Sequence, residues 1–217
     1  MPRRAGTIRQ VSLDDVVSRI HAAVPAQTRA LVAIDGVGAS GKTTLATALA
    51  RHITTRPVLV LHVDDFFNVA AVRHARGRTS AEGFWLDAIN TSALRSALDH
   101  LSAEGEGLYR AASIDHRSGR SWDPPRQAAA PRALVLVEGV FLHRDELVDY
   151  WDFSVWLDVA PDEAARRMVQ RDGLDPDDPR LERYEGAQRL YVERARPRER
   201  ASVVIDMTKP SAPRVVA

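Results

Sequence analysis

The sequence predicts an α/β fold, with a five-stranded parallel sheet and helices on both of its faces. Two observations lead to this prediction. Short apolar runs alternate along the chain with segments in which apolar residues recur at helical spacing. The apolar runs are continuous rather than alternating, which is typical of parallel strands buried on both faces. The chain has 217 residues and is 45% hydrophobic and 27% charged, so we expect a single domain over residues 1–217.

Five apolar runs give the predicted strands. They are rich in Val, Leu and Ile, and each is far shorter than the roughly 18 residues that cross a membrane. Helical segments separate them, and these supply the crossover connections that parallel strands require. The predicted strands are residues 30–34, 57–63, 133–139, 153–159 and 202–206.

The segments between the strands have helix signals at both ends. Ser12 precedes Asp14 and Asp15, which is typical of an N-cap, so we expect residues 1–28 to form a helical extension. The segment 161–172 begins with proline, has acids in its first turn and arginine in its last. The predicted helices are residues 13–24, 42–52, 87–101, 144–151, 161–172 and 180–196, and residues 105–131 are expected to be irregular.

The composition excludes several classes of protein. Thirty basic residues against twenty-nine acidic ones give a net charge of +1, so no general electrostatic attraction to nucleic acid is expected. The absence of cysteine excludes disulfides and fits a reducing compartment. Residues 1–10 are basic without an apolar core, unlike a secretory signal. We expect a soluble, cytoplasmic protein with neither a nucleic-acid nor a membrane partner, and of unknown oligomeric state.

A phosphate-binding motif lies between the first predicted strand and the next helix. Residues 36–43 read GVGASGKT and match G-x-x-x-x-G-K-[ST], the P-loop motif, in the strand-to-helix context that it requires. Glycines let backbone N–H groups surround phosphate oxygens, and the helix N-terminus adds its dipole. Lys42 is expected to reach the outer phosphates of ATP, and the Thr43 hydroxyl to bind Mg²⁺. The predicted nucleotide-binding residues are Gly36, Gly38, Ala39, Ser40, Gly41, Lys42, Thr43 and Thr44.

The rest of the sequence narrows this P-loop NTPase fold to a kinase. An N-K-x-D tetrapeptide is absent, which argues against a GTPase, and so is the L-S-G-G-Q stretch of transporter ATPases. Asp64 and Asp65 end the second strand, where open α/β sheets bind ligands. One carboxylate there can accept the proton of a hydroxyl that attacks the γ-phosphate. Because neighbouring strand residues point to opposite faces, only one is expected to do so. Both could instead be solvated loop residues or helix caps.

Five segments in order resemble the uridine kinase-like family of P-loop kinases, which includes uridine–cytidine kinases, phosphoribulokinase and bacterial pantothenate kinase. They are GVGASGKTT, VDDFF, LVEGVFL, RRMVQRD and ASVVID, and the resemblance covers about residues 30–206. It implies that Asp64 is the catalytic aspartate and that Phe67 replaces the usual tyrosine. Glu138 matches the acid of the magnesium shell. Its place at a strand end, beside glycine, independently favours a magnesium role over a capping one.

The resemblance also suggests an acceptor-binding region over about residues 64–130. Asp87 resembles the family's sugar-binding aspartate, although it could equally be the N-cap of the helix that follows. Tyr109 and His116 resemble a tyrosine followed by a His-x-Arg pair. The gap between them is longer than usual, and Arg117 follows His116 directly.

A lid is expected over about residues 166–184. Arg167 and Arg171 lie one turn apart on one helix face, where a closing lid would bring them against the phosphates. The same arginines could simply stabilise the C-terminal end of the helix. The family often continues with Arg-Gly-Arg, whereas this chain has GLDPDDPRLERY, so Arg180 or Arg183 could substitute.

These features together predict a magnesium-dependent kinase that transfers the γ-phosphate of ATP to a hydroxyl of a small molecule. The first candidate acceptor is the 5′-hydroxyl of uridine or cytidine. Another alcohol, such as pantothenate, a sugar acid or nicotinamide riboside, is the alternative within the same fold. A nucleotide-binding regulatory protein without kinase activity is the alternative from a different class.

Overall fold

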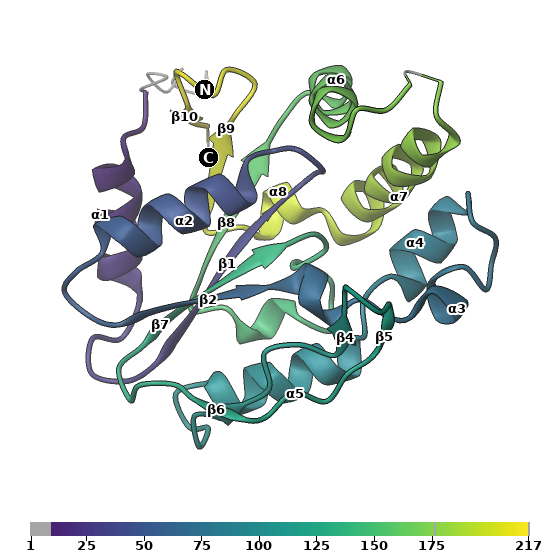
Figure 1. Cartoon of the computed structure of the whole chain (residues 1–217). Coiled ribbons are helices and arrows are strands. Elements are labelled where there is room, and N and C mark those ends of the chain that lie inside the picture. Colours follow the sequence, from purple (N-terminus) through teal and green to yellow (C-terminus); the bar gives the residue numbers. More distant parts are fainter. Residues whose placement is uncertain (1–9, 176, 217) are drawn as a thin grey trace.

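The computed structural model has an α/β fold and describes residues 10–175 and 177–216 (Figure 1). Residues 1–9 of the expected N-terminal extension, residue 176 of the expected lid and residue 217 lie outside the described residues. The strands of the main sheet are β1 (Ala30–Gly36), β2 (Val58–His62), β7 (Leu134–Gly139), β8 (Phe153–Asp158), β9 (Val203–Asp206) and β10 (Arg214–Val215). The helices are α1 (Leu13–Ala23), α2 (Lys42–His52), α3 (Ala70–Arg73), α4 (Ala81–Asp87), α5 (Thr91–Leu101), α6 (Pro161–Asp172), α7 (Pro179–Ala195) and α8 (Pro197–Arg200), with two 3-10 helices, η1 (Val63–Phe66) and η2 (Val148–Tyr150).

The main sheet has the strand order β10-β9-β8-β1-β7-β2. Its five long strands are parallel, as the sequence predicts. The sixth strand, β10, pairs antiparallel with β9 at the edge and was not predicted, because a two-residue strand has no pattern to detect. In the parallel register Ile34 lies beside Glu138 and His62 lies on the other side of Glu138. The carboxyl ends of β1, β7 and β2 therefore meet at one edge.

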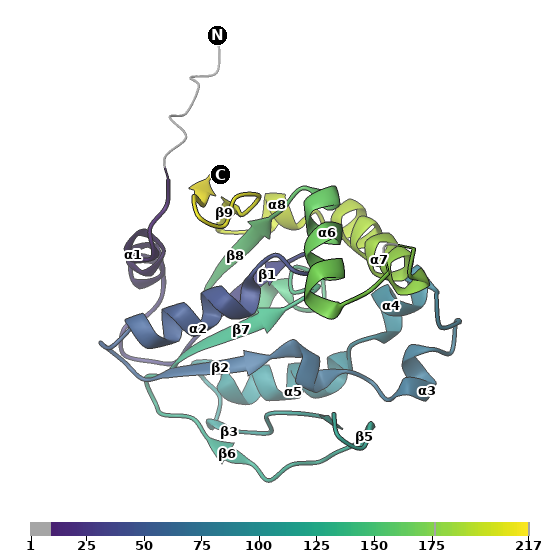
Figure 2. The same ribbon diagram turned by 45° about the horizontal axis from the view of Figure 1, so that its top comes forward.

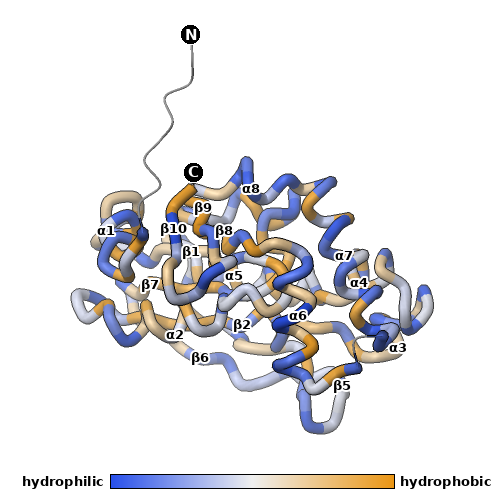
Figure 3. The backbone as a smooth tube through the Cα atoms, turned by 90° about the horizontal axis from the view of Figure 1, so that it is seen from above, coloured by the Kyte–Doolittle hydropathy of each residue, from blue (hydrophilic) through white to orange (hydrophobic). Residues whose placement is uncertain are grey.

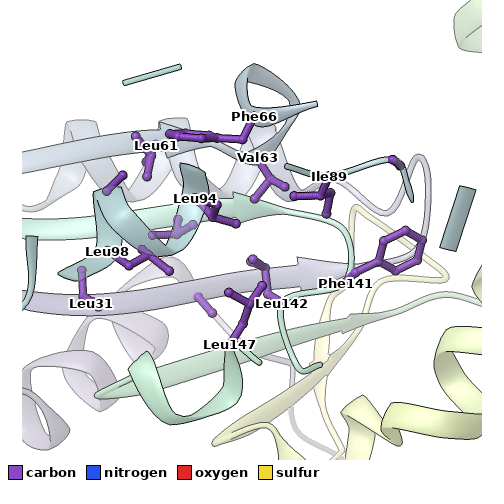
Figure 4. Close-up of a cluster of buried hydrophobic side chains, with 14 of the residues drawn as sticks. Leu31, Leu61, Val63, Phe66, Ile89, Leu94, Leu98, Phe141, Leu142 and Leu147 are labelled. Carbon is purple, nitrogen blue, oxygen red and sulfur yellow. The ribbon is translucent and has the colours of Figure 1, made fainter. Parts of the chain in front are cut away.

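Residues of the central strands alternate between two hydrophobic cores, one on each face of the sheet. Ala30, Val32 and Ile34 pack with α1 and α2 on one face. Leu31 and Ala33 pack on the other face with residues of α5 and of η1, and Figure 4 shows this cluster. Figure 3 shows the difference in hydropathy between a surface helix and a buried strand, since the hydrophobic strand β9 follows the hydrophilic helix α8. The layered arrangement confirms the predicted helices on both faces.

One predicted helix is divided in the structure. The prediction of a single helix over residues 87–101 is wrong, because α4 ends at Asp87 and α5 begins only at Thr91. The side chain of Asn90 caps α5, since its Oδ1 accepts a hydrogen bond from the Ala93 backbone N–H at 3.1 Å. Asp87 is therefore not the N-cap of this helix.

The irregular region and the segment after β7 also have local structure that was not predicted. Residues 105–131 contain two small antiparallel pairs, which the sequence analysis treated as loop. The pairs are β3 (Leu108–Tyr109) with β6 (Gln127–Ala128), and β4 (Ile114–Asp115) with β5 (Arg120–Ser121). The segment 144–151 forms turns and the 3-10 helix η2 rather than an α-helix.

Helices α6 and α7 lie over the carboxyl edge of the sheet, beside α3 and α4 (Figures 1 and 2). The sequence predicted α6 with its observed bounds and α7 to within one residue. A close approach joins α7 to α4, since a Cβ atom on Gly186 would lie 2.6 Å from the Cβ of Ala81. Among the described residues, no helix is both long and apolar enough to cross a membrane.

Candidate active site

A cavity lies at the carboxyl edge of the sheet, where the P-loop, η1, the end of β7 and helices α3, α4, α6 and α7 converge. The cavity has one end at the phosphate loop and another end formed by α3, α4 and α7. A second, adjoining hollow lies along the outer side of the P-loop, and residues of the loop line it together with Arg167, Gln170 and Arg171. The residues that line it are Gly38, Ala39, Lys42, Thr43, Asp64, Phe67, Arg73, Phe84, Glu138, Gly139, Val140, Met168, Arg171, Asp172, Tyr184 and Gln188.

The P-loop backbone has the conformation that its glycines allow. Gly41 has a φ of 98° and caps α2 in the left-handed region, where a residue without Cβ is favoured. At Gly38 a Cβ atom would lie 2.5 Å from the Met168 Cε and 2.9 Å from the Gln188 Nε2. The loop thus passes directly beneath α6 and α7, with no room for a side chain at Gly38.

Lys42 begins α2 and its ammonium group folds over the loop. Nζ donates hydrogen bonds to the backbone oxygens of Gly36 at 3.0 Å and Val37 at 2.8 Å. Burial lowers the pKa of Lys42, while the carboxylates of Asp35, Glu138 and Asp64 act in the opposite direction. Because these acids and the carbonyls hold the charge at the loop, the ammonium is already positioned where phosphate oxygens would enter.

Thr43 and Glu138 provide oxygen atoms of the kind that Mg²⁺ prefers. The Thr43 hydroxyl donates to Glu138 Oε1 at 3.1 Å, and His62 Nδ1 lies 2.6 Å from the same oxygen. Glu138 is 7% exposed and Thr43 is exposed. One carboxylate and one hydroxyl, at the mouth of the phosphate loop, fit a Mg²⁺ ion that keeps several waters and binds nucleotide phosphates. His62, which the sequence analysis did not consider, holds this carboxylate in place.

Asp64 and Asp65 have different environments, but not for the reason given from the sequence. The strand ends at His62 and both aspartates lie in η1, so the alternation of a strand does not apply. Asp64 lines the cavity, and burial raises its pKa against the opposing effect of Lys42. Asp65 instead accepts a hydrogen bond from His116 Nε2 at 3.0 Å and does not line the cavity. The tight turn of η1 directs the two carboxylates apart.

A buried polar network supports the P-loop from below. The Asp35 carboxylate accepts hydrogen bonds from the backbone N–H of Gly36 at 2.7 Å and from Nδ1 of His143 at 2.7 Å. It also accepts one from the hydroxyl of Tyr191, whose pKa burial and Asp35 raise well above its ordinary value. Asp35, His143 and Tyr191 are at most 2% exposed. The network joins β1, the loop after β7 and α7. Its only signal in the sequence is an acid inside an apolar run.

Removing one donor from this network should destabilise the protein. Tyr191→Phe leaves the buried Asp35 carboxylate with one donor fewer, so we expect a loss of about 1–3 kcal/mol of unfolding free energy. Urea denaturation measures it. Tyr150→Phe is the control, because the Tyr150 hydroxyl donates to Asp99 at 2.6 Å in an exposed pair and should cost under about 1 kcal/mol. Equal losses of unfolding free energy in the two variants would show that the buried network stabilises the protein no more than an exposed hydrogen bond does.

Three residues expected to contact the acceptor do not line the cavity. Asp87 forms an ion pair with Arg76 at 2.8 Å. Tyr109 is 2% exposed and packs in the hydrophobic core beneath the sheet. His116 is bonded to Asp65. Their assignment to the acceptor stays a prediction, since the sequence motifs place the three residues near this edge without showing where their side chains point.

Aromatic side chains form the wall of the cavity instead. Phe67 packs edge-to-face on Phe84, with ring centroids 6.1 Å apart, and Phe84 packs on Tyr184 at 4.9 Å. Of these three, only Phe67 is predicted to line the site from its sequence motif. Tyr184 comes from α7, so the wall is completed by a helix more than a hundred residues further along the chain.

The two arginines expected in the lid differ in their contacts. Arg167 donates from Nη2 to the backbone oxygens of Met207 and Thr208, both at 2.9 Å, and lines only the outer hollow. Arg171 lines both hollows and is one of the charges that act on Lys42, and its own pKa is raised by the hydrogen bond to Asp172 and also by the charge of Asp64. Arg171 is therefore nearer the phosphate end, whereas Arg167 ties α6 to the loop after β9.

The comparisons with known proteins agree with this geometry. A family model described as the Phosphoribulokinase / Uridine kinase family matches residues 31–176. A solved structure of a possible uridine kinase from Bacillus stearothermophilus is 24% identical, with a TM-score of 0.69, over 88% of this chain and 96% of that one. A proposed fructose transport system kinase from Silicibacter sp. TM1040 is 21% identical, with a TM-score of 0.66, over 85% and 95% of the two chains. At these identities the solved structures support the fold.

Proposed function

Because the chain belongs to the phosphoribulokinase / uridine kinase family, and is therefore a kinase with an alcohol group as acceptor, we propose that it transfers the γ-phosphate of ATP to a hydroxyl of a small metabolite. The observation that carries the proposal is the position of Asp64. A carboxylate whose pKa is raised by burial lies in one cavity with Lys42 and the P-loop. Carboxylates tuned in this way are suited to general-base catalysis.

In the proposed mechanism each residue has one role. The P-loop N–H groups and Lys42 bind the phosphates, and Arg171 offsets the charge that develops during transfer. Asp64 accepts the proton of the acceptor hydroxyl as its oxygen bonds to the γ-phosphorus, and the bond from that phosphorus to the β-γ bridging oxygen breaks, releasing ADP. Thr43 and Glu138 would hold Mg²⁺, which supplies charge neutralisation between the β- and γ-phosphates.

The acceptor remains the open part of the proposal. Uridine and cytidine are the first candidates from the resemblance, and the aromatic wall of Phe67, Phe84 and Tyr184 is suited to a flat base. The residues that would have held the ribose of a nucleoside do not line the cavity. An alcohol that carries an acidic group, such as pantothenate or a sugar acid, is favoured by a different observation: Arg73 lines the same cavity.

A screen of alcohols tests the kinase directly. Purified protein with ATP and Mg²⁺ is incubated with uridine, cytidine, pantothenate, sugar acids or nicotinamide riboside, and ADP release is measured. We expect at least one alcohol to stimulate ADP release above the rate without acceptor. ATP binding without any alcohol-dependent turnover would favour a nucleotide-binding regulatory protein instead.

A further inference from the structure

Arg73 has no anionic partner among the residues that the structure describes. It ends the short helix α3 and lines the cavity. Its Nε atom is buried without a hydrogen-bond partner in this part of the chain. Other arginines nearby have carboxylates, since Arg76 pairs with Asp87 at 2.8 Å and Arg171 with Asp172 at 2.7 Å. Arg73 is thus a half-buried charged group in the site whose buried Nε has no hydrogen-bond partner among the described residues.

A second arginine reinforces the positive charge at this place. Arg183 on α7 is 5% exposed, and its Nη2 donates to the backbone oxygen of Arg73 at 3.1 Å. Its Nη1 lies 3.4 Å from His74 Nε2, and its own Nε is also buried without a partner among the described residues. Burial lowers the pKa of His74, and Arg183 and Arg73 lower it further. Burial also lowers the pKa of Arg183, with Tyr184 acting in the opposite direction and Arg73 in the same one. The cluster therefore holds like charges together without an acid between them.

Contacts with aromatic rings compensate this cluster only in part: the Arg183 guanidinium carbon lies 5.0 Å from the centroid of the Phe84 ring. Buried charges in proteins are normally paired or hydrogen-bonded, because the loss of hydration is otherwise not repaid. The Arg73 guanidinium carbon lies 5.5 Å from the centroid of the Phe67 ring. Stacking on a ring uses only the flat face of a guanidinium and leaves the N–H donors at its edge, which match an oxyanion in two-pronged geometry.

The cluster lies at the end of the cavity away from the outer side of the phosphate loop. Arg73 lines the cavity but not the adjoining hollow that follows the loop. Its neighbours are His74, which directly follows α3, and Arg183, which lies on α7. Its ring partner is Phe67, part of the wall that faces the acceptor. An anion held by Arg73 would therefore belong to the acceptor rather than to the nucleotide.

We propose that Arg73 binds a carboxylate or phosphate group on the acceptor, so that the substrate of this kinase is an anionic alcohol and not a neutral one. The inference rests on the proposed kinase function. Arg183 acts as a positioning residue, because it holds the backbone of Arg73 and adds a second positive charge behind it. Asp64 would then take the proton from a hydroxyl at the other end of the same acceptor.

Matched pairs of alcohols test the charge requirement. With ATP and Mg²⁺, ADP release is compared for pantothenate and panthenol, glycerate and glycerol, and ribose 5-phosphate and ribose, with uridine and cytidine as neutral nucleosides. We expect the best substrate to be an anionic member, with kcat/KM at least about tenfold above that of its neutral partner. The carboxylate and phosphate pairs distinguish the two kinds of anion. Preference for a neutral alcohol would overturn the inference and leave the kinase standing.

Substitutions test the residue itself. For the best anionic acceptor, Arg73→Gln should raise the acceptor KM by about 10- to 100-fold, with the KM for ATP unchanged, since one charge-assisted contact is lost. Arg73→Lys keeps the positive charge but not the two-pronged geometry of the guanidinium, so it should raise the acceptor KM less than Arg73→Gln does. Arg78→Gln removes an exposed arginine from the same segment and is the control. An effect on the KM for ATP alone, or an equal effect of Arg78→Gln, would contradict the assignment.

Direct binding separates this inference from the kinase proposal. Calorimetry with the same anionic alcohols, without ATP, measures binding to the unsubstituted protein and to Arg73→Gln. Binding that depends on Arg73 but never leads to ADP release would keep the anion site and overturn the kinase. Turnover of the anionic alcohol that is insensitive to Arg73→Gln would keep the kinase and overturn the anion site.

Discussion

Asp64→Asn is expected to lower kcat by about 10²–10⁴-fold, the usual value of a general base. The amide keeps the shape of the side chain and removes only its ability to accept the proton. Because the lost interaction belongs mainly to the transition state, ATP affinity should change little. Steady-state kinetics with the best acceptor from the screen, together with calorimetric titration of ATP and Mg²⁺, measure the two quantities.

Asp65→Asn is the matched control for this substitution. Asp65 lies next in the chain but is bonded to His116 and does not line the cavity, so its loss should be much smaller. Equal and mild losses in the two variants would mean that neither aspartate is the base. A defect of Asp64→Asn that high Mg²⁺ concentrations restore would make Asp64 a metal ligand instead.

The pH dependence of the reaction gives a second readout of the same residue. The base must be ionised, and burial raises the pKa of Asp64 above the ordinary value of 3.8. As the pH falls through this raised pKa, Asp64 takes up a proton and kcat/KM should decline. The acid limb is therefore expected above pH 3.8 and should be absent from the residual activity of Asp64→Asn. A limb that persists in that variant would belong to another group.

Lys42→Ala is expected to weaken binding of ATP with Mg²⁺ by about 1.5–3 kcal/mol, and to lower the rate of transfer further. The ammonium group donates hydrogen bonds to the carbonyls of Gly36 and Val37, so it lies where it could contact both the loop and the outer phosphates. Calorimetry measures the affinity. Arg51→Ala, which removes an exposed positive charge from the far end of the same helix α2, should leave it unchanged. Unaltered ATP affinity in Lys42→Ala would mean that the P-loop assignment is wrong.

Much of the fold could be predicted because it depends on local patterns. The five parallel strands are continuous apolar runs, and a strand buried on both faces needs nothing else to be recognised. Helices α2 and α6 were predicted with their observed bounds. The P-loop motif fixes the start of α2, and Pro161 and Arg171 mark the first and last turns of α6. The division of the predicted helix 87–101 could not be seen. The amphipathic pattern continues across the break, and only the cap at Asn90 marks it.

The candidate site could also be predicted from the sequence only in part. The motifs indicated Lys42, Thr43, Asp64 and Glu138, all of which line one cavity, because parallel strands bring their carboxyl ends to a common edge whatever the rest of the chain does. Their roles stay predictions until the variants are tested. The motifs could not place Asp87, Tyr109 and His116, because the direction of a loop side chain depends on its packing partners.

The sequence by itself determined the parallel sheet, the phosphate loop and the edge at which chemistry would take place. Each of these follows from residues close together in the chain. Only the tertiary structure decided which side chains line the rest of the cavity. Tyr184 reaches the cavity from α7 and Arg73 from α3, Arg183 holds the backbone of Arg73, and Gly186 lets α7 approach α4 closely. Contacts between such distant segments arise from the packing of whole helices, and no local pattern records them.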